Sequence, residues 1–252
     1  MKVRRGHYPL EIIPKVTPLS DAAGEVISVG SEVINFKKNE KVVTAMNGDF
    51  TSGPIKQEIF TRVLGSSIHG VAAEYVVLPE NFLLPLPRNL SFIEGSTLCL
   101  ERPLRDSGST SQTGRLGPGS GHGRSGAKVV AVTSSAAKAE VLKQLGADHV
   151  VNYSESFAAL KMDGLVALVG FRSGKPQEQN ILTSIGSSFA TMRMVYVGPR
   201  SQYEEMNRFI EQHNIHPLVD KEVFPFQNLR ESFTSLASMK YMGKVCVAVV
   251  GS

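Results

Sequence analysis

The chain has few cysteines and no long apolar run, and these absences exclude several classes of protein. Its 252 residues include two cysteines, Cys99 and Cys246, which cannot form the disulfide framework of a small secreted domain. A reducing compartment, the cytoplasm, is therefore expected. No apolar run reaches the length of about 18 residues that a membrane-spanning helix needs. The basic start, Met1–Arg5, lacks the apolar stretch of a signal peptide.

Basic residues are spread along the chain rather than gathered in one run. The 27 lysines and arginines against 23 acidic residues give a net charge of +4, which is only mildly basic. Nucleic-acid-binding proteins typically carry dense basic runs interleaved with aromatic residues, and this chain has none. We therefore expect a small-molecule substrate, with neither nucleic acid nor a membrane as partner. Hydrophobic content of 42% and charged content of 20% are ordinary for a globular protein.

The segment from Ala127 to Tyr153 has the pattern of a strand–helix–strand unit. Its β-branched run, Lys128–Thr133, predicts a buried strand. Ser135 can cap a helix that starts directly after it, and Gly146 ends that helix. Asp148–Asn152 begins the next strand. Strand, helix and strand in succession imply a parallel sheet, and open α/β sheets bind ligands where such a first strand ends. The pattern alone is compatible with any α/β domain.

This segment resembles the second strand–helix–strand unit of the medium-chain dehydrogenase/reductase superfamily. The likeness lies in the serine loop and in the following K-A-E-x-L-K-x-L-G-A-D-H-V-x-N-Y, and is strongest to the quinone-reductase and zinc-type alcohol-dehydrogenase-like branch. Gly24–Gly30 also matches the G-E-V-x-x-V-G segment of the family's catalytic domain. Asn39-Glu40 stands where the family's F-K-x-G-D-x-V turn has Gly-Asp. Gly70–Leu78 resembles the G-x-x-A-E-Y strand that follows in the family.

The resemblance implies an α/β protein: a GroES-like, β-rich catalytic domain joined to an incomplete Rossmann-like parallel α/β domain. We expect the catalytic domain over residues 1–100, an atypical flexible segment over 101–126, the cofactor domain over 127–212, and a C-terminal return to the catalytic domain over 213–252. Further strands are expected at Gly24–Val29, Lys41–Thr44, Gly70–Leu78, Leu165–Gly170 and Met192–Val197. A helix is expected at Gln202–Glu211, with Met206, Phe209 and Ile210 inward, before a final strand, helix and strand.

The segment Arg105–Gly126 departs from the family's pattern. It has one large aliphatic residue, Leu116, and is otherwise rich in glycine, serine and charge, so it is expected to be flexible and exposed. The family has here a strand and a glycine-rich loop that cradles the cofactor pyrophosphate at a helix N-terminus. The glycines at 117, 119, 121 and 123 lack both the preceding strand and the following apolar helix. A frame or splice alteration would produce the same abrupt change in composition.

The end of the first strand predicts which dinucleotide the chain prefers. Rossmann domains that bind NAD place an acidic residue at the end of their second strand, to bind the ribose 2′-hydroxyl. Here Thr133–Ser135 occupy that place and Lys138 follows one turn later. Hydroxyls with a cation suit a 2′-phosphate, so NADP is expected, although Lys138 is equally interpretable as a solvated helix lysine. The resemblance carries phosphate contacts onto Ser134 and Lys138, adenosine packing onto Tyr153, and nicotinamide-side contacts onto Phe171, Ser173 and Lys244.

No bound metal is expected. A structural zinc lobe needs four ligands, and two distant cysteines cannot supply it. The zinc-dependent branch has a Gly-His-Glu motif where this chain has Ser20–Ala22, without histidine. His69 and His149 stand alone and are expected to be surface or framework residues. No acid–base residue can be named: Tyr75 is expected in the core, and Asp21 is a weak candidate lining the cleft.

The function that the resemblance implies is hydride transfer from NADPH to a quinone, an enone or a related carbonyl. The chain would be a zinc-free, NADP-dependent oxidoreductase, impaired by the missing phosphate loop. The alternative is a non-catalytic remnant that binds a nucleotide or a protein partner weakly. The family also implies a homodimer formed through the edge strand Met192–Val197.

Overall fold

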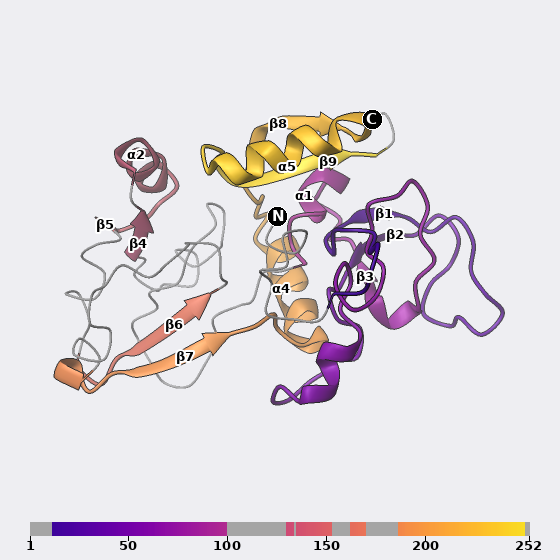
Figure 1. Cartoon of the computed structure of the whole chain (residues 1–252), viewed down its shortest axis with the longest axis horizontal. Coiled ribbons are helices and arrows are strands. Elements are labelled where there is room, and N and C mark those ends of the chain that lie inside the picture. Colours follow the sequence, from indigo (N-terminus) through magenta and orange to yellow (C-terminus); the bar gives the residue numbers. More distant parts are fainter. Residues whose placement is uncertain (1–11, 100–129, 134, 153–161, 170–185, 250–252) are drawn as a thin grey trace. The chain divides into compact units, whose positions relative to one another are not determined.

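The computed structural model describes residues 12–99, 130–133, 135–152, 162–169 and 186–249, which are coloured in Figure 1. The chain divides into two compact units. The first unit joins Met1–Pro103 to Val197–Ser252, and the second is Leu104–Tyr196. The first unit is therefore discontinuous in sequence. Among the described residues, no helix is long and apolar enough to cross a membrane.

The N-terminal part of the first unit is built on an antiparallel sheet of three short strands. Its strands are β1 (Ala23–Glu25), β2 (Lys41–Thr44) and β3 (Leu83–Pro85), in the order β1-β2-β3. The short helices of this part are η2 (Gln57–Thr61), η3 (Glu80–Phe82) and α1 (Phe92–Gly95). The predicted strand at Lys41–Thr44 is confirmed. The one predicted at Gly24–Val29 ends at Glu25, and the side chains of Ile27 and Val29 beyond it are exposed.

Asn39 makes the turn between β1 and β2. Its φ is +71°, in the left-handed region, and the N–H of Glu40 closes the turn on the carbonyl of Lys37 at 3.3 Å. Asparagine enters this region more readily than most residues because its short polar side chain can bond locally. The predicted turn is therefore confirmed, with asparagine at the position where the family has glycine.

The strand predicted at Gly70–Leu78 does not form, and this prediction was wrong. The N–H groups of Gly70, Val71 and Ala72 donate to carbonyls of Thr17–Leu19, which is itself a loop. A strand needs a neighbouring ladder for its backbone groups, and the structure provides none in the part that it describes. Tyr75 was expected in the core, but 73% of its surface is exposed.

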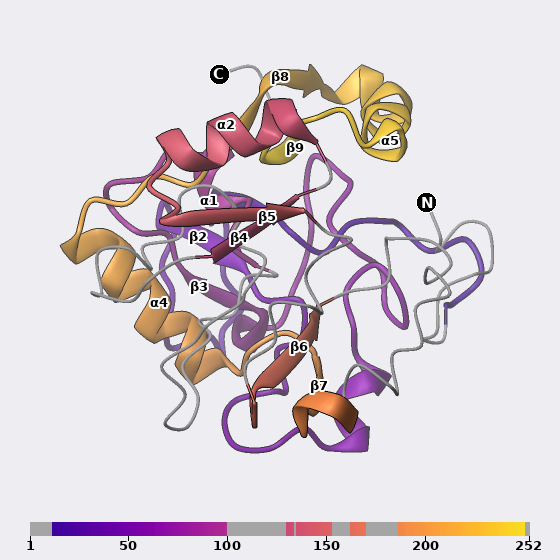
Figure 2. The same cartoon turned by 90° about the vertical axis from the view of Figure 1, so that its left-hand side faces the viewer.

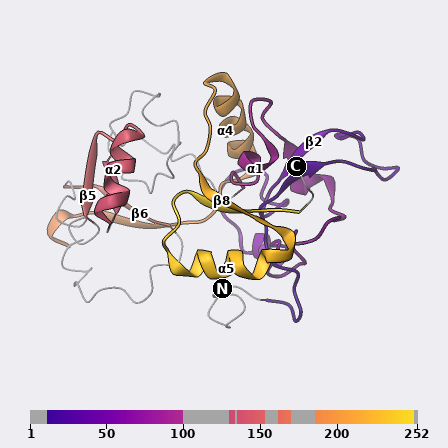
Figure 3. The same ribbon diagram turned by 90° about the horizontal axis from the view of Figure 1, so that it is seen from above.

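The C-terminal part of the first unit follows the predicted order of helix, strand, helix and strand. Its elements are α4 (Arg200–Gln212), β8 (Val219–Pro225), η6 (Phe226–Asn228), α5 (Leu229–Ser238) and β9 (Lys244–Ala248). β8 and β9 pair in parallel, and α5 is the crossover between them (Figures 1 and 3). Ile210 of α4 is buried, and Met206 and Phe209 pack against the same core, as predicted.

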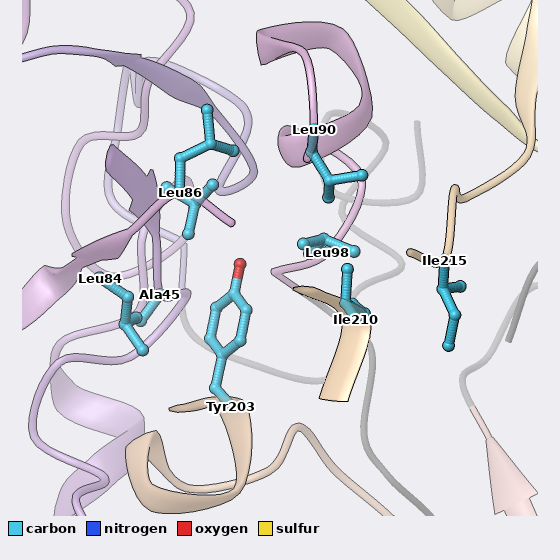
Figure 4. Close-up of a cluster of buried hydrophobic side chains, with 9 residues drawn as sticks. Ala45, Leu84, Leu86, Leu90, Leu98, Tyr203, Ile210 and Ile215 are labelled. Atoms are coloured by element: carbon cyan, nitrogen blue, oxygen red, sulfur yellow. The ribbon is translucent and has the colours of Figure 1, made fainter. Parts of the chain in front are cut away.

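One apolar core joins the two parts of the first unit. Tyr203, Ile210 and Ile215 from the C-terminal part pack with side chains of the N-terminal part (Figure 4). The partners from the N-terminal part are Val43, Ala45, Leu84, Leu86, Leu90 and Leu98. The domain expected over 127–212 included α4, but these contacts place α4 in the first unit.

The second unit contains the predicted strand–helix–strand segment. β4 (Val130–Thr133) and β5 (His149–Asn152) pair in parallel and are joined by α2 (Ala136–Gln144), as Figure 2 shows. The parallel sheet is therefore confirmed. α2 stops before Gly146, whose φ of +92° only glycine adopts easily. β6 (Leu165–Val169) and β7 (Thr191–Val195) form a second parallel pair close to their predicted bounds. The atypical segment Arg105–Gly126 lies outside the described residues.

Candidate functional site

The loop after β4 and the first turn of α2 bring two hydroxyls and a lysine together. The hydroxyl of Ser135 accepts the backbone N–H of Lys138 at 3.4 Å, which caps the helix as predicted. The N–H of Ser135 donates to the hydroxyl of Thr133 at 3.2 Å. Lys138 is half-buried in this first turn, which contains no acidic residue. A helix N-terminus with hydroxyls and a cation is a suitable place for a phosphate group.

Of the other expected cofactor contacts, the part of the chain that the structure describes includes only Lys244. Lys244 is the first residue of β9 in the first unit, where its N–H donates to the carbonyl of Leu218 at 3.1 Å. Lys138 and Lys244 therefore belong to different compact units. The remaining expected contacts, Ser134, Tyr153, Phe171 and Ser173, lie outside the described residues.

In the first unit, Thr44 fixes the backbone on both sides of Asp21. The Thr44 hydroxyl accepts the N–H of Ala22 at 2.8 Å and donates to the carbonyl of Ser20 at 2.7 Å. Thr44 ends β2 and is only 4% exposed, so its hydroxyl is shielded from competing water. The hydroxyl of Ser20 also donates to the carboxylate of Asp21. Asp21 is thus held at a defined position, half-buried two residues before β1.

The backbone just before Asp21 is held in an unusual conformation. Leu19 has a φ of +71°, which is costly for a residue with a branched side chain. Its carbonyl accepts the N–H of Val71 at 2.9 Å. A Cβ atom at Gly70 would overlap the carbonyl oxygen of Leu19. Gly70 is therefore required for the close approach of these two segments, and the approach supports the loop that carries Asp21.

The charge of the Asp21 carboxylate reaches both cysteines. Burial raises the pKa of the Cys99 thiol far above its ordinary range, and the charge of Asp21 raises it further. Burial also raises the pKa of the Cys246 thiol. Among the nearby charges, the ammonium of Lys244 lowers the pKa of Cys246, and the carboxylates of Asp21 and Asp220 raise it. Cys99 Sγ is 3.7 Å from the carbonyl of Ser20, and Cys246 Sγ is 3.9 Å from Ser96 Oγ.

Asp21 was named from the sequence, but the residues that hold it were not. Thr44 was predicted only as the end of a strand, since its partner Ser20 is 24 positions earlier. Ser96 and Cys246 are 150 positions apart. No local pattern of residues signals contacts across such separations. Among the residues that the structure describes, no three His, Cys, Asp or Glu side chains gather as a metal ion would require.

Comparison with known proteins places this chain in a family. The alcohol dehydrogenase GroES-like domain matches residues 1–88. A zinc-type alcohol dehydrogenase-like protein of Schizosaccharomyces pombe is 30% identical, and the alignment covers 98% of this chain and 86% of the relative. The chain belongs to the medium-chain dehydrogenase/reductase superfamily. It is therefore related to oxidoreductases, and its first unit contains the GroES-like domain that the sequence predicted.

Two further members of this superfamily bear on fold and chemistry. A chloroplastic NADPH-dependent alkenal/one oxidoreductase of Arabidopsis thaliana is 27% identical over 98% of this chain and 67% of its own length. The crystal structure of an NAD-dependent alcohol dehydrogenase superposes with a TM-score of 0.77 and 23% identity. It covers 99% of this chain and 87% of that protein. This structural likeness establishes the α/β superfamily fold.

Proposed function

We propose that this superfamily member is an NADP-dependent oxidoreductase that reduces an enone, a quinone or a related carbonyl without zinc. The observation that carries the proposal is the first turn of α2. Together with the hydroxyls of Thr133, which ends β4, and of the cap residue Ser135, this turn supplies the cation of Lys138, and the turn itself contains no acidic residue. A ribose 2′-hydroxyl is bound by an acidic acceptor, whereas a 2′-phosphate needs donors and positive charge.

The residues of this turn fit the phosphate end of the cofactor. A serine hydroxyl that accepts a hydrogen bond in a helix cap still has its own O–H to donate. Ser135 can therefore cap α2 and donate to a phosphate oxygen at the same time. The helix dipole adds positive potential at this end, and Lys138 adds a full charge. As the resemblance to the superfamily implies, Lys244 of β9 is proposed to contact the nicotinamide side of the cofactor.

The proposed substrate is an electron-poor carbonyl compound. When bound, NADPH supplies the hydride, and the protein supplies orientation and electrostatics. The relative from Arabidopsis thaliana, named for NADPH and alkenals or enones, supports this substrate class. Asp21 is not assigned as the proton donor, because Ser20 donates to its carboxylate and the Cys99 thiol lies beside it. We assign it a binding role instead.

The affinity for the cofactor is proposed to be low. Arg105–Gly126 does not have the sequence pattern of the strand, glycine loop and helix that cradle a pyrophosphate in the family. Each lost hydrogen bond to a charged group costs about 1.5–3 kcal/mol, and every 1.4 kcal/mol is about tenfold in affinity. A typical micromolar affinity would then become roughly millimolar. We also propose that the substrate is a small molecule and that two copies of the chain form a homodimer through β7.

Calorimetric titration with NADPH and NADH tests the assignment of the cofactor. We expect millimolar NADPH binding that is tighter than NADH binding, and loss of this preference in Lys138→Ala. Lys143→Ala is the matched control: it removes a cation from the last turn of the same helix, where Lys143 pairs with Glu140 at 2.9 Å. If Lys138→Ala and Lys143→Ala lost the preference for NADPH over NADH to the same extent, a phosphate site at Lys138 would be rejected. Absence of binding and of NADPH consumption with quinones and enones would favour the non-catalytic remnant.

A further inference from the structure

The antiparallel sheet of the first unit has an open edge at β1. The Ala22 carbonyl accepts an N–H of β2 at 3.0 Å, and the Val26 N–H donates to the residue before β2 at 2.9 Å. Because the backbone groups of an antiparallel strand alternate between its two sides, those of Ala23 and Glu25 point away from β2. Among the described residues, β1 pairs with β2 alone, and these outward groups have no hydrogen bond.

Segment 74–78 is an exposed part of the stretch that was predicted as a strand. Its sequence, EYVVL, is rich in the β-branched and aromatic residues that favour strands. Tyr75, Val76 and Val77 are 73%, 44% and 99% exposed. The segment is held at both ends, by the N–H of Ala72 on one side and by the Glu80 carboxylate, which accepts two N–H groups of another loop, on the other. Within the described part of the chain, its own backbone makes no hydrogen bond.

We propose that two copies of this chain associate by pairing β1 of each copy antiparallel with segment 74–78 of the other. The edge of β1 lacks a neighbouring strand and segment 74–78 lacks a ladder, so each supplies what the other needs. Both lie on one part of the first unit, because Ala22, beside β1, and Leu78 pack against the same apolar cluster. A single two-fold axis there forms both pairings at once. This contact is separate from the one proposed for β7, which belongs to the second unit.

Charge selects the register of this pairing. An antiparallel register that places Glu25 opposite Val76 of the second copy also places Ala23 opposite Leu78. A shift by two residues in one direction would bring Glu25 opposite Glu74 of the second copy, and like charges directly opposite each other are destabilising. A shift in the other direction would run past the end of the segment. In the selected register, both outward-facing residues of β1 exchange hydrogen bonds with the second copy.

The test measures the mass of the assembly by sedimentation velocity over a range of micromolar concentrations. Val76→Glu places a like charge opposite Glu25 of the other copy in both pairings. It should halve the mass and raise the dissociation constant of the assembly by about tenfold. Adding Glu25→Lys to Val76→Glu should restore the wild-type mass, because the two charges then attract. Val76→Thr keeps a β-branched residue without charge, and Ile55→Glu adds a charge at an exposed apolar residue outside both features. Both controls should keep the wild-type mass.

Hydrogen exchange on the wild type keeps the inference testable if a variant does not fold. The N–H groups of Glu25 and Val76 should exchange slowly at high concentration and rapidly on dilution. A wild type that stays monomeric would overturn the inference. Protection of Glu25 that does not change with concentration would mean that a strand of another kind covers the edge, and would overturn it too.

The outcomes also separate this inference from the proposed function. If Val76→Glu left the mass of a wild-type assembly unchanged, the copies would meet elsewhere, for example at β7. That result would overturn the inference and leave the proposed function standing. Absence of NADPH binding would reject the proposed function, while a mass halved by Val76→Glu and restored by Glu25→Lys would still support the pairing.

Discussion

Glu94 joins the first turn of α1 to the C-terminal part of the same unit through His216. Its Oε1 atom is 2.7 Å from His216 Nδ1, and its Oε2 atom accepts the N–H and the hydroxyl of Ser91 at 2.9 and 2.7 Å. The Ser91 hydroxyl in turn accepts the N–H of Glu94, which completes a capping box. One carboxylate therefore stabilises a helix start and anchors the segment that leads from α4 to β8.

The Glu94 carboxylate should make the folded protein less stable as the pH falls into the acid range. Burial pushes the pKa of Glu94 up, but the hydrogen bonds from Ser91 and the neighbouring His216 outweigh this and hold it below its ordinary range. A lowered pKa in the folded state adds stability that is present above the unfolded pKa of about 4.3 and is lost as the pH falls below it. In Glu94→Gln, urea unfolding should therefore show reduced stability at pH 7 and a smaller loss of stability than the wild type below about pH 4.3, because Glu80, whose pKa is also lowered, still contributes to the loss.

A comparison with alanine separates the cap from the charge. Glutamine can still accept the N–H of Ser91, whereas alanine removes the box. Glu94→Ala should be less stable than Glu94→Gln by about 1 kcal/mol, the usual value of a helix cap. Equal stabilities for the two variants at pH 7 would show that the capping box contributes nothing.

The cap of α2 gives a second prediction, on the second unit. Ser135→Ala removes the acceptor of the Lys138 N–H and should destabilise α2 by about 1 kcal/mol, whereas Ser135→Gly should cost only a few tenths. Faster hydrogen exchange at the N–H of Lys138 in the alanine variant is the measurement. Unchanged exchange there would mean that the cap is not formed in solution.

Local rules made the strand–helix–strand segment readable from the sequence. Ser135 as a cap, the β-branched run before it and Gly146 after the helix all act within one turn or strand, and the structure has each where it was predicted. The turn at Asn39 followed from the same kind of rule. Leu145 lies at helical spacing from Val141 and Leu142, but it follows the last helical residue and is 45% exposed.

Contacts between distant segments were not readable. Tyr75 lies in an apolar stretch that resembles a strand, yet whether such a stretch is buried depends on a neighbour that its own residues do not specify. The anchoring of Asp21 by Thr44, and the approach of Gly70 to Leu19, arise from the path of the whole chain. The candidate site was therefore predicted as residue types, without the contacts that hold them.

The thiols should be unreactive while the protein is folded. The thiolate is the form that reacts, and burial raises the pKa of both Cys99 and Cys246. At pH 8 we expect slow reaction of both thiols with a thiol reagent in native buffer. In denaturant, two thiols per chain should react rapidly. Because burial is the larger cause, Asp21→Asn should speed the reaction of Cys99 only modestly. Rapid native labelling of Cys99 would contradict the buried position that the structure gives it.

Leu19 provides the sharpest test of the backbone around Asp21. A residue with a Cβ atom in the left-handed region costs about 1–2 kcal/mol, and glycine does not pay this cost. Its side chain is 36% exposed, so truncation loses only part of its packing. Leu19→Ala loses the packing and keeps the strain, whereas Leu19→Gly loses both. The free energy of unfolding, measured with urea, should therefore be higher for Leu19→Gly than for Leu19→Ala by about 1 kcal/mol. This is expected even though glycine has more freedom in the unfolded chain. Gly70→Ala should be far more destabilising than either, because its new methyl group has no space beside the Leu19 carbonyl. If Leu19→Ala proved as stable as Leu19→Gly, Leu19 would not have the left-handed conformation in solution. The position of Asp21, two residues later in the same loop, would then also be wrong.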